Sequence, residues 1–154
     1  YKVINGPKIP KINILKKDSK KFIRLINKSF FFIPAFLEFI RLIKPVNIYV
    51  KDLDKIFYFS YLKGLKIFKN EIWDIKTNSQ NLHYSIKHEY GFNTLKVNGK
   101  FETRTMESYL NFFYFFYLQD LYKENITFRN PINLLKKIFQ VSIIFINNIL
   151  NFKI

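Results

Sequence analysis

The spacing of apolar residues changes from a helical to a strand period at Pro45, and no other feature constrains the fold of this chain as strongly. Apolar and polar side chains alternate in residues 46–52, "VNIYVKD", and again in residues 55–61, "KIFYFSY". A period of two predicts a half-buried strand, and two such runs separated by a short turn containing Asp52 and Asp54 predict a β-hairpin. Residues 71–77, "EIWDIKT", predict a third strand.

Helical spacing precedes this strand region. In residues 18–44 apolar residues recur three or four positions apart, and Asp18 or Ser19 can cap the first turn. Pro34 is suited to the first turn of a second helix. We therefore expect two helices, or one kinked helix, in 18–44, preceded by a linker in 1–17, where proline and glycine lie among lysines.

Helices are also predicted within and after the strand region. Thr77, Asn78 or Ser79 can cap a helix that extends to residue 90, and Thr105 can cap a helix with the aromatic run "FFYFFY" at 112–117. Because this run contains no Lys or Arg, we expect it to pack in a core or an interface rather than to stack on nucleic-acid bases. Asn130 and Pro131 begin a last predicted helix.

The order of elements predicts one α+β domain in 18–154. It has helices in 18–44, a sheet region in 46–102 and C-terminal helices in 105–154. We expect a mainly antiparallel sheet of about four to five strands, with the N-terminal and C-terminal helices packed on it. One shared core is expected to contain the side chains of Trp73, Leu82, Ile86, Leu95 and Val97.

The run "GFNTLKVNGKFE", residues 91–102, predicts a strand and a tight turn. Gly91 would allow a left-handed exit from the preceding helix, and the Asn98-Gly99 pair would permit positive φ at the turn. The structural motif that we single out in this run consists of Gly91, Thr94, Leu95, Val97, Asn98, Gly99 and Phe101.

Few residues suggest chemistry. The chain has no cysteine, which excludes disulfides, thiolate metal sites and iron–sulfur ligation. His83 and His88 lie five residues apart and would point about 140° away from each other on one helix, so they cannot chelate one metal ion. The acids have structural explanations in turns and at helix starts. We therefore expect no catalytic, cofactor-binding or metal site in this chain.

The net charge of +15 arises from 26 Lys and Arg against 11 Asp and Glu. Such a charge favours weak, nonspecific binding of polyanions, although the abundance of Lys, Asn, Ile and Phe is also typical of an AT-rich genome. The apolar segment in 131–154 is flanked by lysines and too short to span a bilayer, which suggests either a buried helix or one in contact with a membrane surface. We expect a cytoplasmic protein that can associate peripherally with a membrane.

Residues 73–102, "WDIKTNSQNLHYSIKHEYGFNTLKVNGKFE", resemble the C-terminal region of metallo-β-lactamase-fold proteins related to CMP-N-acetylneuraminate hydroxylase, several of which carry a Rieske iron–sulfur domain. The order strand, helix, strand, glycine is also similar to sterol carrier protein-like domains, in which a helix and a sheet enclose an apolar tunnel. The resemblance covers about a third of the chain. This chain has neither the HxHxDH metal cluster nor the Cys and His pairs of a Rieske site.

The resemblance implies a non-catalytic accessory domain of a larger metal-dependent protein. The catalytic domain, with its metal, would then lie upstream of Tyr1 and would be the partner of this domain; a start at Tyr rather than Met also suggests a fragment. One alternative is a stand-alone basic module that binds nucleic acid or an anionic membrane surface. A second alternative is a sterol carrier-like protein that binds an apolar ligand.

Overall fold

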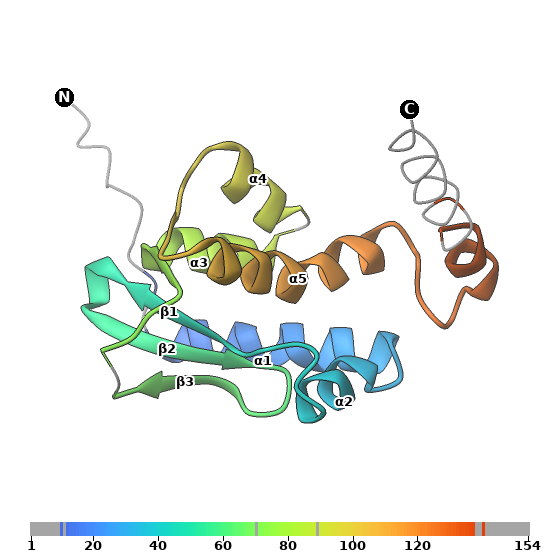
Figure 1. Ribbon diagram of the computed structural model, residues 1–154, viewed down its shortest axis with the longest axis horizontal. Coiled ribbons are helices and arrows are strands. Elements are labelled where there is room, and N and C mark those ends of the chain that lie inside the picture. The colour runs from blue at the N-terminus through green and yellow to red at the C-terminus, as the bar shows by residue number, and fades with distance from the viewer. Residues whose placement is uncertain (1–9, 11, 70, 89, 138–139, 141–154) are drawn as a thin grey trace, which may run out of the picture.

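The computed structural model describes residues 10, 12–69, 71–88, 90–137 and 140. A mixed sheet forms one layer, and the long helices lie against it (Figure 1). The elements in chain order are α1 (Ile12–Ser29), α2 (Ile33–Phe39), β1 (Val46–Val50), the single turn η1 (Lys51–Leu53), β2 (Lys55–Ser60), β3 (Gly64–Phe68), β4 (Ile75–Thr77), α3 (Ser79–Lys87), α4 (Gly91–Val97), β5 (Glu102–Thr103) and α5 (Met106–Lys123).

The sheet has five strands in the order β3-β2-β1-β4-β5. The pairs β1–β2, β2–β3 and β4–β5 are antiparallel, whereas β1 and β4 are parallel, with Ile48 opposite Ile75. This arrangement confirms the predicted α+β class with a mainly antiparallel sheet of four to five strands. The predicted hairpin is β1 and β2, and its turn is closed by Asp54, which adopts a left-handed conformation with φ of 47°.

The core lies between one face of the sheet and the helices. Alternate residues of β1 are buried, as expected for a strand with one face in the core. These buried side chains pack against helix side chains and not against a second sheet. Phe59 of β2 lies 5.9 Å from the ring of Phe22 on α1 and 4.7 Å from that of Phe115 on α5. On α5, the side chains of Phe112, Phe115 and Phe116 are fully buried, whereas that of Tyr114 is exposed. One side of the aromatic run therefore packs in the core.

Two predicted caps are present. The side chain of Asn78 accepts a hydrogen bond from the Asn81 N–H at the start of α3, and Thr105 accepts one from the Ser108 N–H at the start of α5. Each cap satisfies an N–H group that has no partner within its helix. Both caps are formed within three residues, which is why the sequence predicts them, and Asp52 of η1 adds a distant acceptor for the Ser79 N–H at the start of α3.

Two predicted boundaries in the N-terminal half are wrong. The first helix begins at Ile12 and not at Asp18, so residues 12–17 are not a linker: Ile12 packs against the core and Leu15 is fully buried. The prediction for residues 1–9 and 11 lies outside the described residues. The third strand of the chain is β3, which was not predicted, and only residues 75–77 of the predicted strand 71–77 are in the sheet.

Residues 91–97 form the helix α4 and not the predicted strand. Phe92 and Leu95 are buried and lie three positions apart, on one side of a helix, where Phe92 packs 5.1 Å from the rings of Phe112 and Phe116. Val97 is 83% exposed, so it does not belong to the predicted shared core, and Trp73 is only half-buried. Packing against α5 therefore overrides the strand propensity of Thr94 and Val97.

The two glycines of this segment have different roles from those predicted. The left-handed residue after α3 is Tyr90, with φ of 55°, and not Gly91. Gly91 instead allows close approach, because a Cβ there would lie 2.4 Å from the Tyr84 carbonyl oxygen. Gly99 has the predicted positive φ, but it ends α4 and does not join two strands. The Gly99 N–H donates to the carbonyl of Lys96, and the Lys100 N–H donates to the carbonyl of Leu95, which is the Schellman arrangement.

Residues 131–137 are helical, as predicted for the last segment. Most of the apolar stretch that we expected to contact a membrane, 138–139 and 141–154, lies outside the described residues. None of the helices in the described part of the chain is long and apolar enough to cross a membrane.

Candidate ligand-binding site

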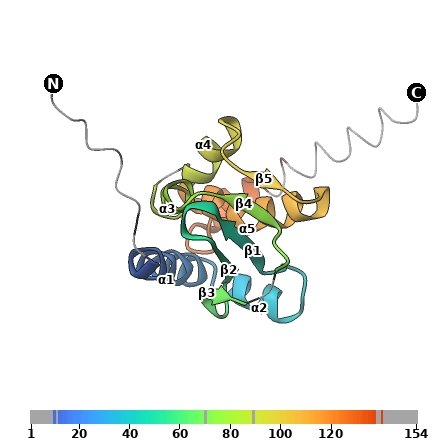
Figure 2. The same ribbon diagram turned by 90° about the vertical axis from the view of Figure 1, so that its left-hand side faces the viewer.

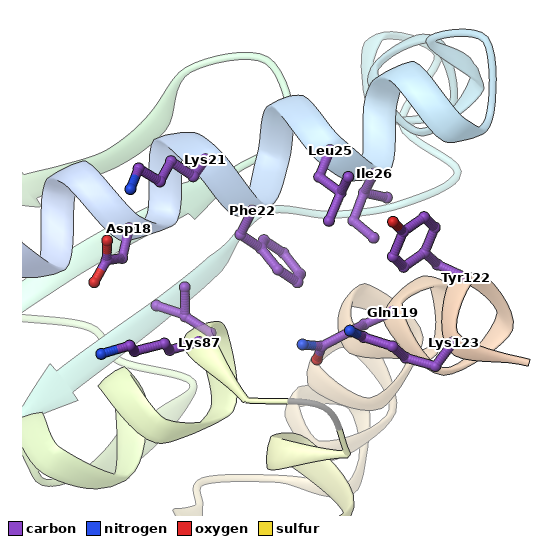
Figure 3. Close-up of a pocket in the computed structure, with 10 residues that line it drawn as sticks. Asp18, Lys21, Phe22, Leu25, Ile26, Lys87, Gln119, Tyr122 and Lys123 are labelled. Carbon is purple, nitrogen blue, oxygen red and sulfur yellow. The ribbon is translucent and has the colours of Figure 1, made fainter.

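A cleft of about 240 Å³ opens between α1, α3 and α5, three elements that are distant in the sequence (Figure 3). Its apolar wall and its polar side chains come from all three helices. The residues that line it are Asp18, Lys21, Phe22, Leu25, Ile26, Ile86, Lys87, Gln119, Tyr122 and Lys123.

The wall of the cleft is apolar because two helices turn their core-facing sides toward it. Phe22 and Ile26 are buried and lie four positions apart on α1, and Ile86 is buried on α3. Leu25 lies at the edge of the same wall and is 43% exposed. A molecule in the cleft would therefore contact side chains that are continuous with the protein core.

Gln119 places one polar group at this wall. Its side chain is buried, and its Nε2 donates a hydrogen bond to the backbone carbonyl of His88 at 3.3 Å. Its Oε1 is buried and has no hydrogen-bond partner. An unpaired buried acceptor costs about 1 to 3 kcal/mol, so a ligand that donates a hydrogen bond to this oxygen would gain binding free energy.

Cations lie around the mouth of the cleft. Lys21 extends from α1 and Lys87 from α3, and both are exposed (Figure 3). Lys123 lies 5.5 Å from the centre of the Tyr122 ring on α5. The field at the mouth therefore favours an anionic group.

Among the described residues that line the cleft, Asp18 is the one acid, and it is already paired. Asp18 Oδ2 lies 2.8 Å from His83 Nε2. The hydrogen bond with His83 lowers the pKa of Asp18, with further contributions from the charges of His83, Lys21 and Lys87, although partial burial opposes the shift. The carboxylate is therefore held ionised by its neighbours, and it ties α1 to α3 beside the cleft.

The motif predicted in 91–101 does not line this cleft. Gly91, Thr94, Leu95, Val97 and Asn98 lie on or at the end of α4, and Gly99 and Phe101 border a separate hollow of about 200 Å³ beside Lys76 and Glu102. Phe101 packs against the ring of Phe112 at 5.3 Å. Of the motif, Gly91, Leu95 and Phe101 take part in packing, whereas Thr94, Val97, Asn98 and Gly99 are exposed, and the cleft is formed elsewhere.

The two histidines have different partners. His83 is paired with Asp18, and His88 stacks on the ring of Tyr84 at 4.4 Å. Within the described residues, no three His, Asp or Glu side chains lie close enough to hold a metal ion.

Sequence reasoning missed the cleft because its residues are separated by about a hundred positions in the chain. The available signal was Gln119, a polar residue within a helix whose middle is aromatic. Its burial could have been anticipated, but its position opposite α1 could not.

No protein-family model matches this chain, and no curated protein matches it. One solved structure, described as "UbiJ-SCP2 Ubiquinone synthesis protein", is similar with a TM-score of 0.38 and 16% sequence identity, and the match covers 74% of this chain and 95% of that chain. A likeness of this degree assigns neither a family nor a function.

Proposed function

We propose that this domain binds a small amphiphilic molecule, with an apolar body and an anionic head, in the cleft between α1, α3 and α5. The observation that carries the proposal is the combination of a buried apolar wall with lysines at the mouth of the cleft. Ligand sites are typically apolar concavities with a few placed polar groups. The proposal corresponds to the apolar-ligand alternative and adds a charged end to the ligand.

The size of the cleft restricts the ligand. A volume of about 240 Å³ is below the range of roughly 300 to 1,000 Å³ that holds drug-sized molecules. The occupant is then a short acyl chain, a small ring, or one segment of a longer lipid. Its apolar part would lie on Phe22, Ile26 and Ile86, and its head would lie near Lys21 and Lys87.

Displacement of the uncharged fluorescent probe N-phenyl-1-naphthylamine tests this proposal. Decanoate and decanol share an alkyl chain and differ in charge, so the proposal predicts that decanoate displaces the probe at lower concentration. Lys21→Glu and Lys87→Glu should weaken displacement by decanoate by about tenfold and leave decanol unchanged, because each reverses a charge at the mouth.

Lys17→Glu is the matched control, since Lys17 is exposed on α1 and does not line the cleft. Equal displacement by decanoate and decanol, or equal effects of all three substitutions, would contradict an anion-selective cleft.

The accessory-domain hypothesis remains a prediction that rests on the resemblance in 73–102. It requires a longer polypeptide with an HxHxDH metal cluster upstream, and sequencing the transcript around the codon for Tyr1 tests it. Within such a protein, the proposed cleft would hold a substrate or an effector of the upstream domain.

A further inference from the structure

We propose that the face formed by α1, α2 and the turn between β2 and β3 docks on the surface of an anionic lipid bilayer. Figure 2 shows α1, β3 and α2 along one side of the molecule, with α4 and β5 on the opposite side. This docking face shares no residue with the lining of the ligand cleft, so the inference does not depend on the proposed ligand.

The first part of the docking face is a basic groove of about 530 Å³ between α1 and the β2–β3 turn. Its floor is apolar and includes Ile23, Tyr61 and Leu65. Its rim carries five exposed cations, and no Asp or Glu is among the described residues that line it. The cations are Lys16, Lys20, Arg24, Lys63 and Lys66.

The second part is a cluster of exposed apolar side chains at the end of this groove. Phe32, Phe36 and Phe39 are 66%, 58% and 73% exposed, and Leu62 is 50% exposed. Phe32 and Leu62 also line the basic groove, so the two parts are continuous. Exposed apolar clusters bordered by charged residues mark interaction sites rather than ordinary surface.

The fold holds this cluster in place. Glu38 is buried beneath α2 and accepts hydrogen bonds from the Ser60 hydroxyl and from the Tyr61 N–H. Pro34 and Glu38, four positions apart, are the buried residues of α2, whereas Phe36 and Phe39 are exposed. Arg41 follows α2 with a left-handed φ of 64° and closes the helix in the Schellman arrangement, because its N–H donates to Glu38 and that of Leu42 donates to Leu37.

The basic groove and the exposed apolar cluster together favour a lipid bilayer as the binding partner. Cations beside an anionic leaflet are attracted by its surface potential, and phenyl and leucine side chains enter the boundary between head groups and acyl chains. Nucleic acid would instead require aromatic rings interleaved with cations along a strand path, whereas here the rings lie at one end of the cationic groove. The chain's net charge of +15 acts in the same direction.

Cosedimentation with vesicles tests the proposal. The protein should bind vesicles of phosphatidylcholine that contain roughly 30% phosphatidylglycerol at least about tenfold more tightly than vesicles of phosphatidylcholine alone. Lys20→Glu/Lys63→Glu and Phe32→Ser/Phe39→Ser should each lower binding by about tenfold or more. Lys100→Glu and Tyr114→Ser are the controls, since both residues are exposed outside the docking face. These two substitutions should leave vesicle binding unchanged. Equal loss in the controls, or equal binding to both vesicles, would overturn the proposal.

Site-specific labelling separates docking from general charge attraction, and the absence of cysteine makes it direct. Leu62→Cys and the distant control Val97→Cys are each labelled with an environment-sensitive nitrobenzoxadiazole probe. Anionic vesicles should raise the emission and shift it to the blue at position 62 only. The same response at both positions would refute this docking face. A response at position 62 to a thymidine oligonucleotide, without one to vesicles, would identify a nucleic-acid surface and also refute the proposal.

Discussion

The buried carboxylate of Glu38 accepts a hydrogen bond from the backbone N–H of Tyr61 at 2.6 Å, and so joins α2 to the turn that follows β2. Removing this acceptor leaves the Tyr61 N–H buried without a partner. Glu38→Ala should therefore lower the free energy of unfolding by about 1 to 3 kcal/mol, measured by urea denaturation. Glu107→Ala, which removes an exposed ion pair with Lys44, should cause little change. A neutral Glu38→Ala would mean that α2 is not held by this contact.

Phe32→Gly separates the stability of the docking face from its function. Phe32 has a φ of 61°, which glycine adopts without strain, and its side chain is largely exposed. The relief of backbone strain and the greater freedom of glycine in the unfolded chain nearly cancel, so unfolding free energy should change by less than about 1 kcal/mol. Vesicle binding should nevertheless fall. Parallel loss of stability and binding would show that the ring is a packing residue.

Gly91→Ala and Gly99→Ala should destabilise the protein for different reasons. At Gly91 the new Cβ would lie 2.4 Å from the Tyr84 carbonyl oxygen and 2.8 Å from the Ser85 Cα, which forces α4 away from α3 at a cost of about 1 to 3 kcal/mol. At Gly99 there is open space but φ is 59°, so the cost is about 1 kcal/mol.

Gly99→Asn, which tolerates a left-handed conformation better than alanine, should recover part of the loss, whereas Gly91→Asn should not. Thermal melts of the four variants measure both comparisons. Rescue at residue 91 by asparagine would point to backbone conformation, and not close approach, as the reason for that glycine.

The pair of Asp18 and His83 predicts a pH-dependent contribution to stability. The pKa of Asp18 is lowered in the folded protein by its hydrogen bond with His83, so the unfolded state binds the proton more readily. The stabilising contribution is thus present above the ordinary aspartate pKa of about 3.8 and is lost as the pH falls through the lower folded value.

Asp18→Asn should therefore reduce the free energy of unfolding at pH values above about 4, and the difference from the unsubstituted protein should shrink as the pH falls below this value. Urea denaturation at a series of pH values provides the measurement. A difference that stays constant through the acidic range would show that Asp18 acts by packing rather than by its charge.

The sequence predicts those parts of the fold that depend on neighbouring residues. The β1–β2 hairpin follows from alternation around Asp52 and Asp54, and the starts of α3 and α5 follow from Asn78 and Thr105, whose side chains bond to N–H groups three residues away. These interactions are local, so the relevant residues are adjacent in the sequence.

The errors concern residues whose conformation is set by distant partners. Phe92 and Leu95 form a helix because α5 supplies the rings against which they pack, and the parallel pairing of β1 with β4 joins strands separated by two others. Lys66, Ile67 and Phe68 of β3 are all exposed, so this edge strand lacks the alternating burial pattern by which the other strands are recognised. The candidate cleft is nonlocal in the same sense, since Phe22, Ile86 and Gln119 meet only in the folded chain.

Calorimetric titration with decanoate of two tryptophan variants tests the proposed ligand cleft most directly. Leu25 and Ile14 are both on α1 and are 43% and 44% exposed, but only Leu25 lines the cleft. A tryptophan at position 25 should fill the cleft mouth and lower the affinity for decanoate by at least about tenfold, whereas Ile14→Trp should bind as the unsubstituted protein does. Equal affinity of both variants for decanoate would contradict the assignment of ligand binding to this cleft.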